Sequence, residues 1–239
     1  MTDLPNQVPL ALSDDLVAPL YKRDPETGAR VADDDLDTLA GALRYAHGQA
    51  EQVLALSRAL RADPTKSPSA VALTLREKGL KAGEQAAHSL DQARNRLSAT
   101  VARLSAETAA PLLIRDAGAM MLEGEIRAAL ARMSPKDRTA AIGQAFDDRE
   151  DSVIGAVLRG PALLSGLGTD QRQMLQDRYR RERHPQEADR IMRLTKALDG
   201  LERGAAALLD FTKAVVTAPH ALAAEQAAER TEQALARFN

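Results

Sequence analysis

Apolar residues return at alternating spacings of three and four along most of the chain, as expected for one buried helix face. Between residues 36 and 60 this spacing is strict over about four heptads. The positions are Leu36, Leu39, Leu43, Ala46, Ala50, Val53, Ser57 and Leu60. The run Asp33-Asp34-Asp35 suits a helix N-terminus, because carboxylates cap the first turn and complement the helix dipole. We therefore expect a helix over residues 34–62.

A second long helix is expected after a turn at residues 63–66. Ser67 suits its N-cap and Pro68 its first helical position. Its apolar face comprises Val71, Leu75, Ala82, Ala86, Leu90, Ala93, Leu97, Val101 and Leu104, while Gly79 and Gly83 weaken its first half. Without a break before Pro111 it spans about 60 Å at 1.5 Å per residue. Because the connection is so short, residues 34–110 should form a long antiparallel helical hairpin.

Shorter helices are expected in residues 111–183. Leu112, Leu113, Met120, Met121, Ile126 and Leu130 indicate a third helix that ends near Met133. Its two adjacent methionines are expected to fill the core, and an adaptable binding surface is the alternative. Ser134 to Asp137 resembles a capping box in which Asp replaces Glu, and it is followed by a short helix through Ile142 and Phe146. A further short helix covers 147–158, and Gly160-Pro161 stops it. Thr169 should cap a helix that runs to about Arg183.

Residues 184–239 should contain a long return helix and a C-terminal helix. The return helix starts at His184-Pro185 and reaches about Thr217. Its predicted seam is Ile191, Leu194, Leu198, Leu201, Ala205, Leu208 and Leu209. After Pro219, residues 221–238 form one more Ala-rich helix.

Residues 1–33, called the leader below, differ from the rest because four prolines interrupt any helix. Asp24 to Gly28 is a turn signal, and residues 20–22 and 29–31 can pair across it as a small hairpin. Two interpretations stay open, a loosely packed segment and an extended arm that docks on a neighbouring subunit. The second stays open because the apolar content is above that of a linker. Its candidate interaction residues are Leu10, Leu12, Leu16, Leu20 and Tyr21.

Composition agrees with an all-α, elongated helical bundle that has a thin core. The chain is 44% hydrophobic but only 3% aromatic, and alanine supplies much of the apolar content. A net charge of −2 disfavours a dedicated nucleic-acid binder, and the absence of cysteine excludes disulfides and thiol catalysis. Residues 1–12 lack a signal-peptide pattern, and no apolar run is long enough to span a membrane. We therefore expect a cytoplasmic location.

No catalytic, cofactor-binding or metal site is predicted. A di-iron bundle site needs Glu followed three residues later by His, twice, whereas Glu84 and His88 are four apart. Ser165 lacks the frame of a nucleophile elbow, and Gly166 and Gly168 read as turn residues. Glu123 and Glu125 project about 200° apart on a helix and cannot share a substrate. We therefore expect a protein that is not an enzyme.

A basic stretch over residues 170–196 carries eight Lys or Arg interleaved with five acids. One interpretation is a solvated surface with many ion pairs. The others are contact with nucleic acid and contact with the acidic 14–37 segment of a neighbouring copy. The candidate interaction residues here are Arg178, Arg180, Arg181 and Arg183.

Three features together resemble helical virion-associated proteins of tailed phages and prophages. They are the segment 21–28, the Ala-rich hairpin, and the central runs 134–138 and 157–167. The resemblance mainly covers residues 110–215. It implies a multi-copy virion component, located in the host cytoplasm and the virion, with itself and other virion proteins as partners, and no cofactor. The alternatives are a cytoplasmic helical adaptor with one protein partner and a weakly nucleic-acid-associated helical protein.

Overall fold

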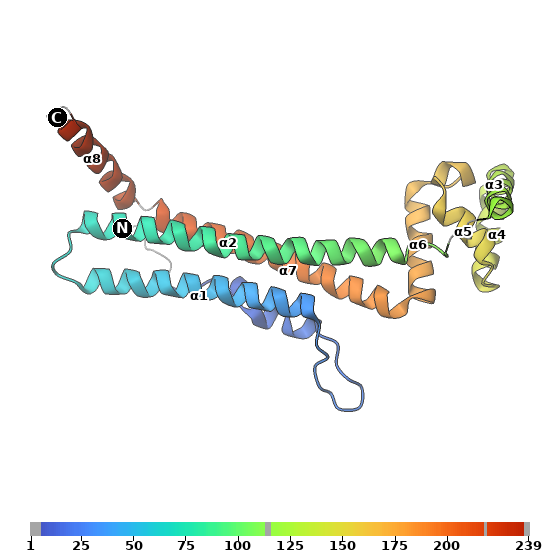
Figure 1. Cartoon of the computed structure of the whole chain (residues 1–239), viewed down its shortest axis with the longest axis horizontal. Helices are drawn as coiled ribbons and strands as arrows, with labels where there is room; N and C mark the ends of the chain where they lie inside the picture. Colours follow the sequence, from blue (N-terminus) through green and yellow to red (C-terminus); the bar gives the residue numbers. More distant parts are fainter. Residues whose placement is uncertain (1–5, 113–115, 218, 237–239) are drawn as a thin grey trace. The chain divides into compact units, whose positions relative to one another are not determined.

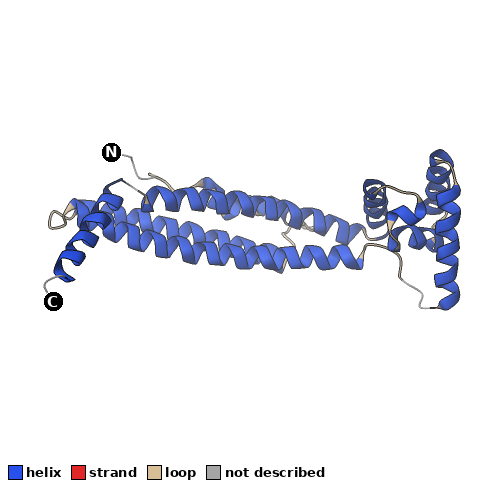
Figure 2. Cartoon of the chain, turned by 90° about the horizontal axis from the view of Figure 1, so that it is seen from above, coloured by secondary structure: helices blue, strands red, loops and turns tan. Residues whose placement is uncertain are grey.

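The structure, a computed structural model, describes residues 6–112, 116–217 and 219–236. All regular secondary structure in these residues is helical, as Figure 2 shows, which confirms the all-α class. Leu113 and Phe238, which were expected in helices, lie outside the described residues. The α-helices, labelled in Figure 1, are α1 (Asp34–Ala62), α2 (Pro68–Glu107), α3 (Ala117–Arg132), α4 (Pro135–Asp147), α5 (Asp151–Arg159), α6 (Thr169–Arg183), α7 (Pro185–Val216) and α8 (Pro219–Ala236).

The chain forms two compact units. The first takes in Met1–Ala99 and Arg193–Asn239, and the second takes in Thr100–Met192. In the first unit α1, α2 and α7 lie side by side, with α1 and α2 antiparallel (Figure 1). The predicted α1 seam is buried from Leu36 to Ser57, and Leu60 is half-buried. The helical hairpin is therefore confirmed where it lies in this unit.

The seam of α7 differs from its prediction. The buried residues are Leu194, Ala197, Leu201, Gly204, Leu208, Phe211 and Val215, which keep a strict heptad spacing. Leu198 and Ala205 are only half-buried, and Leu209 is exposed. The prediction was wrong at these three positions. It placed Leu198 and Ala205 in the seam where their neighbours Ala197 and Gly204 are buried, and both of these are small enough to let the helices approach closely. Gly79 of α2 likewise receives the side chain of Val215.

The described part of the leader contains three short 3-10 turns, η1 (Leu10–Leu12), η2 (Asp14–Leu16) and η3 (Ala18–Leu20), of which η1 and η2 pack onto α1. Leu12 and Val17 are almost completely buried. The predicted hairpin is present, because the backbone N–H of Asp24 donates to Ala29 O at 2.8 Å and that of Val31 to Lys22 O at 2.8 Å. Gly28 has φ +67°, which explains the glycine at this turn. The leader is thus part of the core of the first unit.

The second unit packs its helices around a small core of its own. That core is Leu130, Ile142, Phe146, Ile154, Val157, Leu158 and Tyr179. Ser134 caps α4, since its hydroxyl accepts from Asp137 N at 3.2 Å and donates to the Asp137 carboxylate at 2.7 Å. The N-cap at Ser134 is therefore confirmed, but the Asp137 carboxylate accepts from the Ser134 hydroxyl, whereas in a capping box it would accept from the Ser134 backbone N–H. Thr169 is the first residue of α6 and not its cap, because the N-cap is Gly168, whose N–H donates to Gln171 Oε1 at 3.0 Å.

Candidate interaction surfaces

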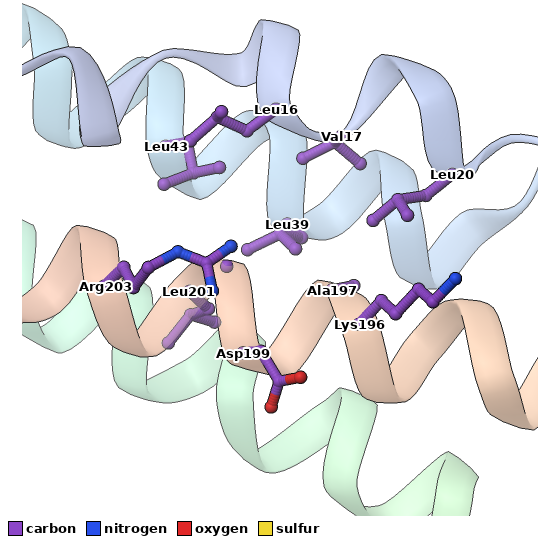
Figure 3. Close-up of a pocket in the computed structure, with 11 residues that line it drawn as sticks. Leu16, Val17, Leu20, Leu39, Leu43, Lys196, Ala197, Asp199, Leu201 and Arg203 are labelled. Carbon is purple, nitrogen blue, oxygen red and sulfur yellow. The ribbon is translucent and has the colours of Figure 1, made fainter.

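A groove of about 320 Å³ runs between the leader and α7 in the first unit. Figure 3 shows leader side chains and α1 leucines on one side and α7 on the other. Its apolar lining is Leu16, Val17, Leu20, Leu39, Leu43, Ala197 and Leu201, with Gly200 beside them. Lys196, Asp199 and Arg203 add charge from α7. The groove therefore offers apolar contact, with two cations and one carboxylate of α7 beside it.

The five leader residues predicted to make contacts divide into two groups. Leu10 is 84% exposed and Leu16 43% exposed, whereas Leu12 and Tyr21 are buried in their own chain. Leu20 is half-buried and lines the groove. Of the predicted set, Leu10, Leu16 and Leu20 are therefore the ones with surface to offer another molecule.

Tyr21 is held by two residues of its own unit. Its hydroxyl donates to Asp37 Oδ1 at 2.8 Å, and the Arg30 guanidinium lies 3.4 Å from its ring centroid while also pairing with Asp37. Burial and the hydrogen bond to Asp37 raise the pKa of Tyr21 to about 12. This tyrosine anchors the base of the hairpin to the first turns of α1.

Arg180 of the basic stretch points inward. Its side chain is only 12% exposed, and its Nε donates to Thr108 Oγ1 at 2.9 Å. It also donates to the carbonyl of Ser105 at 3.3 Å and pairs with Asp177 at 3.0 Å. These contacts tie α6 to the end of α2 within the second unit.

Arg178 and Arg183 tie α6 to the two preceding helices. Arg178 pairs with Asp147 at 2.8 Å and lies over the Phe146 ring at 4.6 Å. Arg183 pairs with Asp151 at 2.6 Å. Arg181 is exposed. The basic stretch is therefore built largely of intramolecular contacts, and of the four candidate residues Arg181 is the one that faces outward.

A partly buried ion-pair cluster joins α3 and α5. Glu123, 12% exposed, accepts from Arg127 at 3.3 Å and from Arg159 Nε at 3.0 Å. Arg159 also donates to the carbonyl of Pro111. Burial raises the pKa of Glu123, but the two guanidinium groups outweigh it and hold the pKa below its usual range. Glu125 faces solvent, so the two carboxylates do point apart as predicted.

Large apolar side chains are exposed on the second unit. Met120 and Met121 on α3 are 59% and 68% exposed, so their assignment to the core was wrong. The α3 helix begins at Ala117. Leu130 and Ile126 define the face of α3 that packs against the core, and both methionines lie outside that face. The remaining exposed apolar residues of the described part of this unit are Leu112, Leu122, Met133, Leu163, Leu164, Met174 and Met192. Only the phase of the helix, meaning which side of α3 faces the core, could have shown that the two methionines are exposed.

No group of three metal-ligating side chains occurs among the described residues. Ser165 is buried and its hydroxyl has no hydrogen-bond partner there, while the His47 imidazole lies 3.5 Å from Glu51. None of the described helices is long and apolar enough to cross a membrane.

Comparison with known proteins returns no relative. No family model matches the chain, and no curated protein or solved structure matches it either.

Proposed function

We propose that this chain is a multi-copy assembly protein that acts through helix–helix contacts and not through catalysis. The observation that carries the proposal is the set of exposed methionine and leucine side chains on α3 and η4 (Ala162–Ser165) of the second unit. Soluble proteins seldom leave apolar side chains of this size gathered at the surface unless another protein covers them. Methionine suits such contacts because its flexible thioether adapts to different partners.

The resemblance to helical virion-associated proteins extends the proposal to a location. We propose that the assembly is a tailed-phage or prophage particle, with the chain in an accessory, internal or scaffold-like position. Mass spectrometry of purified particles from the source of this sequence tests it. The chain should be found there in several copies, and its absence from complete particles would remove the virion part of the proposal.

An adaptor is the second candidate, and the groove between the leader and α7 favours it. An apolar lining with Lys196 and Arg203 beside it fits a partner segment that carries apolar and acidic side chains. Contact with nucleic acid is a weaker candidate, since Arg178, Arg180 and Arg183 are engaged within the unit.

Solution mass separates these functions. Light scattering after size exclusion, over a wide range of protein concentration, should give a defined oligomer for the full chain. The double variant Met120→Glu, Met121→Glu should be monomeric, because each carboxylate would have to be buried in the contact. Leu209→Glu is the matched control, since Leu209 is also an exposed apolar residue but lies on α7 of the first unit. A monomer at every concentration would overturn the multi-copy proposal and favour the adaptor.

A further inference from the structure

We infer that the outward face of α3 is a self-pairing surface, which binds the same face of a second copy in an antiparallel arrangement. This inference rests on the proposed assembly function and names its partner and its contact. Three observations carry it: the phase of the helix, the exposed apolar side chains, and two opposite charges that have no partner among the described residues.

The phase of α3 separates a core face from an outward face. Leu130, in the core, is nine residues after Met121, which at 3.6 residues per turn places the two side chains about 180° apart. Glu125, Ala128 and Arg132 follow Met121 at spacings of four, three and four, so all four lie along one line of the helix. This line, the outward stripe, is therefore Met121, Glu125, Ala128 and Arg132.

The outward stripe is flanked by apolar surface. Met121 is 68% exposed, and its neighbours Met120 and Leu122 are 59% and 49% exposed. The heptad-like spacing of the stripe is the one that places side chains against a facing helix. Beside the stripe, no atom of another segment lies within 4 Å of where a Cβ on Gly124 would be, so the space at this position is open.

The charges on the stripe favour one orientation of the partner. Glu125 and Arg132 are exposed, and neither has an ion pair within the described residues, whereas Glu123 and Arg127 on the inner side are paired. They lie seven residues apart, about 10 Å along the axis. An antiparallel second copy, with its two-fold axis near Ala128, places Glu125 opposite Arg132 of that copy, twice. A parallel copy would place like charges opposite each other.

Charge reversal tests the pairing. Glu125→Arg and Arg132→Glu each create two like-charge contacts in the antiparallel pair, so each should weaken self-association about tenfold or more. The double variant, in which the charges are exchanged, should associate like the wild type. An equimolar mixture of the two single variants should form a mixed pair, because every contact across it joins opposite charges. Sedimentation equilibrium measures all four samples, and circular dichroism checks that each variant remains helical.

Single cysteines test the orientation, because the chain contains no cysteine of its own. Ala128→Cys lies near the two-fold axis and should give a disulfide-linked dimer when oxidised. Met121→Cys is the matched variant on the same stripe. In an antiparallel pair its two copies are about 20 Å apart, too far for a disulfide, whereas a parallel pair would link both variants equally.

The outcomes distinguish the inference from the function on which it rests. Loss of association in both single variants, recovery in the mixture, and a disulfide at residue 128 alone would support the antiparallel pairing. A wild-type oligomer unaffected by either reversal would overturn the α3 pairing and leave the assembly function in place. A wild-type monomer would overturn the assembly function itself, and the pairing with it.

Discussion

Gly204 of α7 lies directly against the backbone carbonyl of Ala11 in the leader, so that a Cβ on residue 204 would be 2.9 Å from that oxygen. The same Cβ would lie 3.2 Å from a methyl group of Leu43. A backbone atom cannot move aside as a side chain can. The absence of a side chain at this one position is therefore what allows the leader to pack into the bundle.

We expect Gly204→Ala to lower the free energy of unfolding and to loosen the leader. The clash should cost about 1–3 kcal/mol, which exceeds the gain of about 1 kcal/mol from better helix propensity. Gly48→Ala on α1 is the matched control, since nothing lies within 4 Å of its added Cβ, and it should be stabilising. Urea denaturation measures both, and limited proteolysis should cut the leader of Gly204→Ala faster. Equal stabilisation by both substitutions would contradict this packing.

Tyr21→Phe removes the hydrogen bond to Asp37 and keeps the ring against Arg30. We expect the free energy of unfolding at neutral pH to fall by about 0.5–1.5 kcal/mol. The pKa of Tyr21 is raised to about 12, above its unfolded value of 10.0, so its contribution is complete below pH 10 and is lost as the pH rises towards 12. Alkaline denaturation curves should therefore converge for the two proteins. If the two denaturation curves stay parallel through this range, the Tyr21 hydroxyl is not the group that causes the difference in stability.

The long helices are predicted well from the sequence, because the buried positions that form each seam recur at a fixed spacing along the same helix. Leu36, Leu39 and Leu43 repeat so regularly that the bounds of α1 follow almost directly. In α7 the same reasoning gave the wrong residues at some positions. Alanine and glycine are not expected in a buried seam until the facing helix, which packs closely against them, is known. The size of the side chain that fits a seam position depends on the facing helix, and a single sequence does not show which helix that is.

The candidate surfaces were harder to predict for a related reason. The leader has no helical period, so the burial of Leu12 and Val17 could not be read from spacing. In the short helix α3 several phases fit the apolar residues almost equally well, and only the position of Leu130 against Ile142 and Phe146 decides which side is outside. A docking surface stayed open for the basic residues of α6 because several groups that engage them come from other segments, among them Asp147, Asp151 and the Ser105 carbonyl.

The different environments of Arg180 and Arg181 give a direct test of that last point. Arg180→Ala should lower the free energy of unfolding by about 1–3 kcal/mol, because it leaves Thr108 and the Ser105 carbonyl without their charged donor. Arg181→Ala, on the exposed side, should change it by less than about 0.5 kcal/mol. Thermal unfolding of the two variants checks this. If both are neutral, the contacts of Arg180 contribute nothing to stability and the residue is available to a partner.

Acid should weaken the second unit through Glu123. Two guanidinium groups hold the pKa of Glu123 below its ordinary value of 4.5, so its stabilisation is complete above that value and is lost as the pH falls through the folded pKa. Glu123→Gln cannot ionise and leaves Arg127 and Arg159 without a counter-charge. We expect it to be less stable than the wild type at pH 7, by about 1–3 kcal/mol after discounting for partial exposure, and nearly equal to it well below pH 4.

Glu125→Gln, which removes a solvent-exposed carboxylate from the same helix, should leave both ends of the profile unchanged. Denaturation midpoints measured from pH 3 to 7 decide the matter, and a gap between wild type and Glu123→Gln that persists in acid would show that the amide fails for steric reasons and not for loss of charge.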